Sequence, residues 1–258
     1  SSSADANGIV ISTTGNTVYQ RSWQTGFWPF QTDHFSWIGG SGKTNWRYLT
    51  NLTGGHAVEV NGGNLLVYNG SYTATQGEGI LVRNGNAYIV DGTFHGGDVY
   101  KDSGNSIEGE PVAGPAASYG FKMIGGNVSI FNGSFGGNGS GAFIMGTSTA
   151  QATANIYGGN FEVTGQAGVS VYEYATLTVT PNGTATLPAT ITEIGTEVSQ
   201  TGTDVFMKGN AAGLVIEQTG DAAAPTLTIK GGSYQSIRDD GGDGVWNGNQ
   251  YASLTING

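Results

Sequence analysis

Short apolar segments with a period of two run through most of the chain, and Gly, Asn, Ser and Thr separate them. The segment Thr226-Leu227-Thr228-Ile229-Lys230 shows the pattern, because its two aliphatic residues alternate with polar ones. Such alternation is typical of half-buried β-strands. The separating residues are poor helix formers and recur every few positions, so helices are not expected. The pattern therefore predicts an all-β protein.

One strand segment recurs, each time with two aliphatic residues on one face. Its aliphatic pairs are Leu65/Val67, Ala87/Ile89, Val128/Ile130, Ala154/Ile156, Leu177/Val179, Leu227/Ile229 and Leu254/Ile256. A second apolar segment precedes each copy, at 57–60, 79–82, 120–123, 142–145, 168–171, 204–207 and 244–247. Two strands thus alternate through about seven units with a shortest spacing of about 22 residues, a period typical of solenoids. No unit can bury its apolar face alone, so like units are expected to stack around one core.

An aromatic residue follows the glycine at the end of most copies and begins the next side of each unit. These residues are Tyr72, Phe94, Phe135, Phe161 and Tyr234. They are expected to point inward, next to the aliphatic pairs. The glycines before them supply positive φ at corners where a Cβ would clash.

The repeated Ile/Val-x-Gly/Asn-Gly-x-Phe/Tyr corner and the length of the units resemble the right-handed parallel β-helix of the pectin-lyase-like superfamily, over residues 55–258. The resemblance implies a solenoid of about seven coils. Members of the superfamily include polysaccharide lyases and hydrolases, phage tailspikes, adhesins and surface proteins. A fold does not determine a function, so the resemblance leaves the activity open. A non-catalytic surface or adhesin-type member is favoured.

Residues 1–54 lie outside the repeat and hold four of the five Trp residues, Trp23, Trp28, Trp37 and Trp46. This segment is interpreted as an aromatic-rich N-terminal cap, which the terminal unit of a solenoid needs for solubility. An aromatic surface for a partner or a sugar is the alternative. Residues 254–258 stop inside a unit, and an open strand edge is a template for association. Either the chain is truncated there or the edge is covered, as in a head-to-tail filament in which the four Trp residues meet the bare end of the next copy.

Two stretches interrupt the repeat. Residues 97–118 are expected to form a surface loop inserted in one coil, and residues 185–202 a Thr-rich coil.

The outward-facing positions of the recurring strand form columns if the units stack in register. Asn ladders and stacked aromatic residues stabilise solenoids by themselves, which is one interpretation of these columns. A second is sugar binding by stacking on the aromatic residues Tyr68, Tyr88, Phe131 and Tyr157. A third is an array that orders water and binds ice, formed by Thr176, Thr178, Thr226, Thr228 and Thr255.

The densest acidic cluster is a Gly-rich turn that contains Asp239, Asp240 and Asp243. Three carboxylates can coordinate Ca²⁺, a hard cation that prefers oxygen ligands; a solvated corner without metal is the alternative. A glycosidase needs a pair of carboxylates, one on each side of the sugar bond that it cleaves. The same turn, with Glu217 or Asp204 on neighbouring units, is the only candidate source of such a pair. No spacing shows that these carboxylates converge, so no catalytic residue is assigned.

Composition narrows the partners further. The chain has 258 residues, 46 of them Gly, no Cys, 11% charged residues and a net charge of −10. Phosphate binding needs clustered Lys and Arg, so nucleic acid is not an expected partner. No apolar run approaches the about 20 residues of a membrane helix. The low charge and the richness in Gly, Ser, Thr and Asn favour a secreted or cell-surface protein.

Six Asn-x-Ser/Thr sequons would accept glycans if the protein passes through a eukaryotic secretory route. They begin at Asn51, Asn69, Asn127, Asn132, Asn138 and Asn182. In total, the sequence favours an extracellular structural or adhesive solenoid, as a filament or surface-layer subunit with polysaccharide as its contact. The alternatives are a polysaccharide-degrading hydrolase or lyase and an ice-binding protein. Enzymatic activity stays undecided, and a protein without it is favoured.

Overall fold

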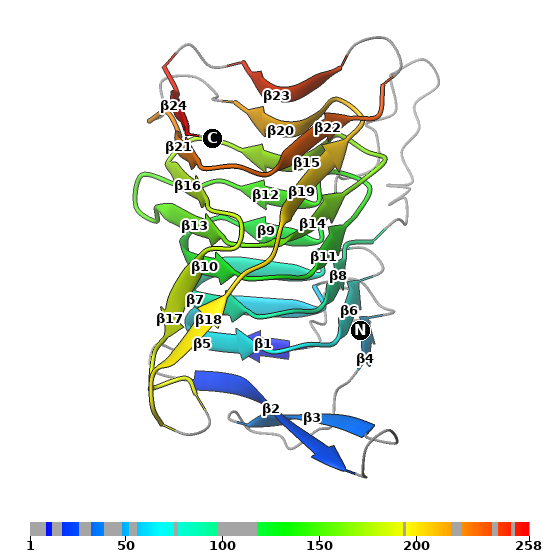
Figure 1. Ribbon diagram of the computed structural model, residues 1–258, viewed down its shortest axis with the longest axis vertical. Coiled ribbons are helices and arrows are strands. Elements are labelled where there is room, and N and C mark those ends of the chain that lie inside the picture. Colours follow the sequence, from blue (N-terminus) through cyan, green and yellow to red (C-terminus); the bar gives the residue numbers. More distant parts are fainter. Residues whose placement is uncertain are drawn as a thin grey trace, which may run out of the picture.

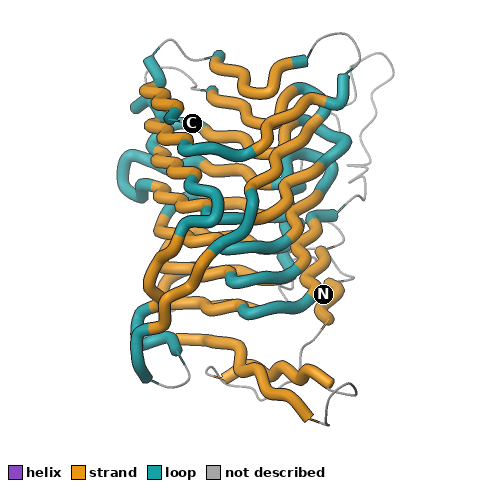
Figure 2. Tube along the Cα trace, in the orientation of Figure 1, coloured by secondary structure: helices purple, strands orange, loops and turns teal. Residues whose placement is uncertain are grey.

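The computed structural model consists of β-strands joined by turns and loops, with no helix among the described residues (Figures 1 and 2). The structure describes residues 56–74, 77–97, 118–192, 195–217, 223–238, 242–248 and 251–257, and the backbone of 9–11, 17–25, 32–38 and 48–51. In this part of the chain no helix is long and apolar enough to cross a membrane. The prediction of an all-β protein is confirmed for these residues.

Most strands are parallel and lie in a fifteen-stranded sheet that bends into two faces. Two long strands, β5 (Val58–Val67) and β7 (Ile80–Ile89), contribute their first halves to one face and their second halves to the other. The first face continues from β7 through β9 (Phe121–Met123), β12 (Ala142–Ile144), β15 (Ala167–Val171), β20 (Ala212–Ile216) and β23 (Asp243–Asn247). The second face continues from β7 through β10 (Gly126–Ile130), β13 (Ala152–Ile156), β16 (Ala175–Val179), β21 (Thr226–Ile229) and β24 (Ser253–Ile256).

Glycine makes the bend between the two faces. Gly62, Gly85 and Gly126 lie at successive levels of the bend, with φ values of 110°, 94° and 84°. A Cβ at Gly85 would lie 2.5 Å from the carbonyl oxygen of Gly63 on the level below. Positive φ and this close stacking leave room only for glycine.

A seven-stranded parallel sheet, the third sheet, completes each level and closes the core. It consists of β4 (Tyr48–Asn51), β6 (Ser71–Ala74), β8 (Thr93–His95), β11 (Ser134–Gly136), β14 (Gly159–Glu162), β19 (Val205–Gly209) and β22 (Ser233–Ser236). Its aromatic residues point inward as predicted, because Tyr72, Phe94, Phe135 and Phe161 are all fully buried. Their rings stack from level to level, with centroids 4.9, 5.2 and 4.7 Å apart. Tyr234 is half-buried against the same core.

Six of the seven predicted aliphatic pairs share this core; in the last pair Leu254 is half-buried against it, but Ile256 is 60% exposed, so the expectation is wrong for Ile256. Val128 pairs in register with Ala87 and Ala154, and Ile130 with Ile89 and Ile156. Like residues therefore lie above one another along parallel strands, and the fold is solenoid-like. At one end, β1 (Ile9–Ile11) and β2 (Thr17–Thr25) pair with β5 in parallel, and β2 pairs antiparallel with β3 (Thr32–Ile38).

Two expectations about the repeat are wrong. Residues 204–207 were expected on the first face, but β19 lies in the third sheet between β14 and β22. The first-face strand of that level is β20, whose Ala-Gly-Leu resembles the Ala-Gly-Val that begins β15. Residues 185–202 do not form a coil. Instead β17 (Thr184–Leu187) and β18 (Val198–Thr201) form an antiparallel hairpin.

The hairpin runs along the outside of the stack, next to β5, β7 and β10 (Figure 1). Its apolar residues Leu187 and Ile191 are fully buried in a cluster with Leu66 and Phe131 of the second face. The polar residues Thr184, Thr186 and Ser199 stay exposed. An apolar underside and a polar outer side explain why this insertion lies on the solenoid rather than projecting from it.

Candidate functional site

The outer side of the first face carries a groove of about 530 Å³ at the level of β15, β20 and β23. Ser170, Val215 and Trp246 occupy equivalent positions on these three strands, and they form its floor and one end. Arg238, which follows β22 of the third sheet, lines one side of the groove. The remaining lining comes from residues at or near the ends of the three first-face strands: Gln166, Tyr172, Ala211, Glu217, Gly242 and Asp243. Because parallel strands lie about 4.8 Å apart, the groove spans about 10 Å along the solenoid axis.

Aromatic rings give the groove an apolar surface. Trp246 is 40% exposed, which is unusual for so large a side chain in the described part of the chain. A Cβ at Gly248 would collide with the ring of Trp246, so glycine lets the indole lie flat over the end of β23. The Gly248 amide donates a hydrogen bond to the carbonyl oxygen of Ile216 at the adjacent level, and Glu217, the residue after Ile216, lines the groove together with Trp246. Tyr172 lines the groove from β15 and stacks on Phe143, with centroids 4.9 Å apart.

The polar groups of the groove include two carboxylates, Glu217 and Asp243. The Tyr172 hydroxyl donates a hydrogen bond to Glu217. Burial raises the pKa of Tyr172, and the hydrogen bond and negative charge of Glu217 raise it further, so the phenol stays protonated. Glu217 and Asp243 place two carboxylates in the lining, against one guanidinium from Arg238. The groove can thus offer carboxylate oxygens and aromatic surface to the same ligand.

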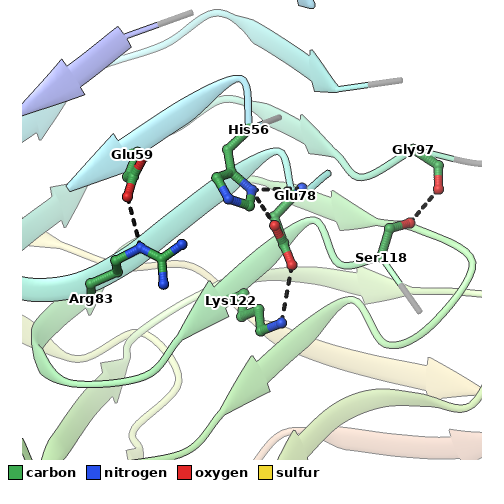
Figure 3. A network of polar contacts seen from close by, with 7 residues as sticks. All are labelled: His56, Glu59, Glu78, Arg83, Gly97, Ser118 and Lys122. Atoms are coloured by element: carbon green, nitrogen blue, oxygen red, sulfur yellow. Dashed lines mark hydrogen bonds and ion pairs between the residues drawn. The ribbon is translucent and has the colours of Figure 1, made fainter. Parts of the chain in front are cut away.

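A cluster of ion pairs lies on the same outer face at the level of β7 and β9 (Figure 3). The buried carboxylate of Glu78 contacts His56, and its Oε1 lies 3.2 Å from Nζ of Lys122. Burial alone would raise the pKa of Glu78, but His56 and Lys122 outweigh it and hold the pKa at about 2. The Lys122 ammonium also lies over the rings of Tyr119 and Phe143, at 5.2 and 5.6 Å from their centroids. The cluster therefore holds an ammonium group between two rings and a carboxylate.

A second ion pair and a hydrogen bond flank the cluster in Figure 3. Arg83 Nε lies 2.7 Å from Glu59 Oε1, and the Ser118 hydroxyl donates to the carbonyl oxygen of Gly97. These contacts join levels that are about 20 residues apart in sequence, so the cluster braces the N-terminal part of the first face. Sequence reasoning did not identify it, because its members are single residues at unrelated positions of the repeat.

The aromatic residues expected to bind sugar do not form an open surface. Phe131 is only 1% exposed, because the β17–β18 hairpin covers it. Tyr68, Tyr88 and Tyr157 are half-buried in the same cluster. Phe131 and Tyr157 do stack as expected, with centroids 5.1 Å apart. The expectation that this row faces solvent is wrong for Phe131, and the hairpin is the physical reason.

The polar columns of the second face stack as predicted. The Asn86 amide donates to Asn64 at 2.8 Å, and the Asn127 amide donates to Asn86 at 3.0 Å, which forms an Asn ladder. Further along, Thr176 pairs with Thr226, and Thr178 pairs with Thr228, which pairs in turn with Thr255. Thr176, Thr226 and Thr255 are exposed, whereas Thr178 and Thr228 are half-buried. Their geometry is that of a regular array; ice binding by it stays a prediction.

The candidate carboxylates separate in the structure. Glu217 and Asp243 share the groove, but Asp204 accepts a hydrogen bond from Asn182 at 2.7 Å on another side. Asp239 and Asp240 lie outside the described residues. Among the described residues, no three His, Asp or Glu side chains gather in a way that could hold a metal ion. Calcium binding by the acidic turn stays a prediction.

Several sequons lie in turns where their side chains are already engaged. Asn132 donates to Asp91 at 3.1 Å, Asn182 to Asp204, and the Asn138 side chain accepts from Ser118. Asn69 is exposed, with its side-chain oxygen accepting from the backbone of Gly70, and only the backbone of Asn51 is described, in β4. Of the proposed assembly residues, Trp23 and Trp37 lie on β2 and β3, which are described by backbone alone. Trp28 and Trp46 lie outside the described residues.

Comparisons of the chain with models of protein families, with curated proteins and with solved structures give no match.

Proposed function

We propose that the protein is an extracellular adhesive solenoid that contacts carbohydrate through the groove on its first face. Secretion or display at a cell surface belongs to this proposal, as does a structural role in a filament or surface layer. The observation that carries the proposal is the partly exposed Trp246 beside Tyr172 and the acceptors Glu217 and Asp243. Ligand sites combine apolar and aromatic surface with a few polar groups that fix orientation, and this groove has both.

The fold proposed for this role is a right-handed parallel β-helix of about seven coils over residues 55–258, with residues 1–54 as its aromatic-rich N-terminal cap. Support comes from the three stacks of parallel strands and from the pairing of β1 and β2 with β5. Such a solenoid presents long, regular faces, and long faces suit a long polymer.

The chemistry of the carboxylates in the groove favours a role in adhesion over a role in hydrolysis. A glycosidase needs a carboxylic acid with a raised pKa opposite a second carboxylate. Glu217 is engaged by the Tyr172 hydroxyl, and an acceptor held in this way suits the binding of sugar hydroxyls and amines. The carboxylates of Glu217 and Asp243 are placed to serve as hydrogen-bond acceptors for a bound sugar.

The test is a binding assay against a panel of soluble and insoluble polysaccharides, read by co-sedimentation and by tryptophan fluorescence. We expect binding of at least one glycan, and at least tenfold weaker binding by Trp246→Ala. Tyr251→Ala is the matched control, because Tyr251 is a 71% exposed aromatic residue outside the groove lining. Absence of binding across the panel, or equal losses in the two variants, would refute the proposal. Release of reducing ends or unsaturated products would show an enzyme instead.

The in-register Thr columns support a second candidate function, which is the binding of ice. Thr176 with Thr178 and Thr226 with Thr228 repeat an uncharged Thr-x-Thr unit on adjacent levels of a flat sheet. Thermal hysteresis of the wild type, and its loss in Thr226→Lys, would establish this function. A melting and freezing behaviour equal to that of albumin at the same concentration would exclude it.

A further inference from the structure

The first face already contains a built site for an ammonium group, occupied by the protein's own Lys122. The Lys122 Nζ lies 5.2 Å from the ring centroid of Tyr119 and 5.6 Å from that of Phe143. The Glu78 carboxylate lies 3.2 Å from the same nitrogen. Aromatic faces and a carboxylate together stabilise a cation, because the ring quadrupole and the negative charge both attract it.

The groove repeats this set of groups two to four levels further along the same face. Tyr172 and Trp246 supply the rings, and Glu217 and Asp243 supply the carboxylates. The residues in register with Lys122 on the groove strands are Ser170, Val215 and Trp246. Lysine is thus replaced by an uncharged side chain at each of these positions, and all three residues line the groove.

The charge of the groove favours a cation as the occupant. Within the described lining, two carboxylates face a single cationic side chain, Arg238. Glu217 and Glu173 both act electrostatically on the Tyr172 phenol and raise its pKa, which indicates a negative potential at the wall of the groove. The whole chain carries a net charge of −10, so polyanionic glycans are repelled at long range as well.

We propose that the groove binds an amino sugar polymer with free ammonium groups, of the polyglucosamine class, by placing one ammonium between Tyr172, Trp246 and the Glu217 carboxylate. This inference rests on the proposed carbohydrate-binding function and names its ligand. The sugar rings stack on the indole of Trp246, and the levels of the solenoid, about 4.8 Å apart, align the polymer with the solenoid axis.

The experiment compares glucosamine oligomers with N-acetylglucosamine oligomers of the same length, by titration calorimetry at a pH where the free amines are protonated. Polygalacturonate serves as the polyanion. We expect the glucosamine oligomer to bind at least tenfold more tightly than the acetylated one, and polygalacturonate not to bind. Glu217→Gln should lose at least tenfold in affinity for the glucosamine oligomer only, because it removes the charge and keeps an acceptor for Tyr172.

Glu162→Gln is the control for general charge. Glu162 is an exposed carboxylate on β14 of the third sheet, 2.9 Å from Lys208, so the substitution changes the net charge equally but leaves the groove intact. Equal losses in Glu217→Gln and Glu162→Gln would overturn the inference, because they would indicate nonspecific attraction by an acidic protein. Equal binding of both oligomers, insensitive to Glu217→Gln, would overturn the ammonium site and leave the carbohydrate-binding function standing. Failure of all glycans to bind would overturn both.

Discussion

The two outer faces of the fifteen-stranded sheet are built from similar parallel strands, but their surfaces differ. The first face stays open, is braced by the ion pairs of Glu78, and carries a groove with an exposed Trp. On the second face the β17–β18 hairpin buries Phe131 and leaves the other aromatic residues of that row half-buried, and an Asn ladder braces the strands. Exposed aromatic residues on a repeat are therefore a site only where no inserted segment covers them. An insertion thus decides which outer face of this solenoid-like fold stays open.

The largest loss of stability is expected in the aromatic stack of the core, because both faces pack against that core. Phe135→Ala removes a ring that lies 5.2 Å from Phe94 and 4.7 Å from Phe161. We expect a loss of about 4 kcal/mol in the free energy of unfolding, because a large buried side chain leaves a cavity. Denaturant titration measures it. Phe143→Ala, on the half-buried outer side of the first face, is the control and should cost clearly less; equal losses would contradict the assignment of the core.

Acid should weaken the first face before the second. The pKa of Glu78 is lowered from 4.5 to about 2, so its contribution to stability is complete above about pH 4.5 and disappears as the pH falls towards 2. The shift corresponds to a stabilisation of the order of 3 kcal/mol. Glu78→Gln should flatten the pH dependence of the unfolding free energy over this range. An unchanged acid profile in this variant would show that the contacts of Glu78 with His56 and Lys122 do not carry the effect.

A substitution in the buried cluster of the second face should weaken the packing of the hairpin without affecting the first face. Leu187→Ala removes a buried side chain that packs in the cluster with Phe131, and we expect a loss of about 2–3 kcal/mol. Thr186→Ala, on the exposed side of the same strand, should change the stability by less than about 0.5 kcal/mol. Faster hydrogen exchange in β17 and β18 of the Leu187 variant, with β20 unchanged, would localise the effect. Comparable losses from both substitutions would contradict the packing described for the hairpin.

The smallest effect is expected in the Asn ladder. Asn86→Ala removes one donated and one accepted side-chain hydrogen bond, of 2.8 and 3.0 Å. Because each such bond contributes about 0.5–1.5 kcal/mol net, the expected loss is about 1–2 kcal/mol in thermal or chemical unfolding. Asn86→Asp is the comparison, since it keeps the acceptor and loses the donor. An alanine variant as stable as the wild type would mean that the Asn ladder does not contribute to the free energy of unfolding.

The regular part of this architecture could be predicted from the sequence because similar strand segments recur along the chain and stack on one another. The pairing of Val128 with Ala87 and Ala154, and the inward stack of Phe94 and Phe135, follow from aligning similar segments. The misplacement of residues 204–207 has a local cause. Val205-Phe206-Met207 has the same alternation as a first-face strand, and the Ala-Gly signal shared by β15 and β20 was the better guide.

The sites were harder to predict because they depend on contacts between dissimilar residues. Glu78, Lys122 and Tyr119 meet across levels without any shared motif. The burial of Phe131 depends on where the hairpin lies, and no local pattern in residues 184–201 encodes that position. Glu217 and Asp243 were named as candidate carboxylates, and the structure does bring them into one groove. Their aromatic partner Trp246 was missed, although it is the one Trp outside residues 1–54.

The most direct test of the central claim is a hydrogen-exchange comparison of the free protein and the protein saturated with a glucosamine oligomer. The account predicts slower exchange in residues 166–172, 211–217 and 243–248, which line the groove, and no change in the Thr columns of β16 and β21. Protection confined to β16 and β21, or spread evenly over both faces, would contradict the claim that the open first face is the binding surface.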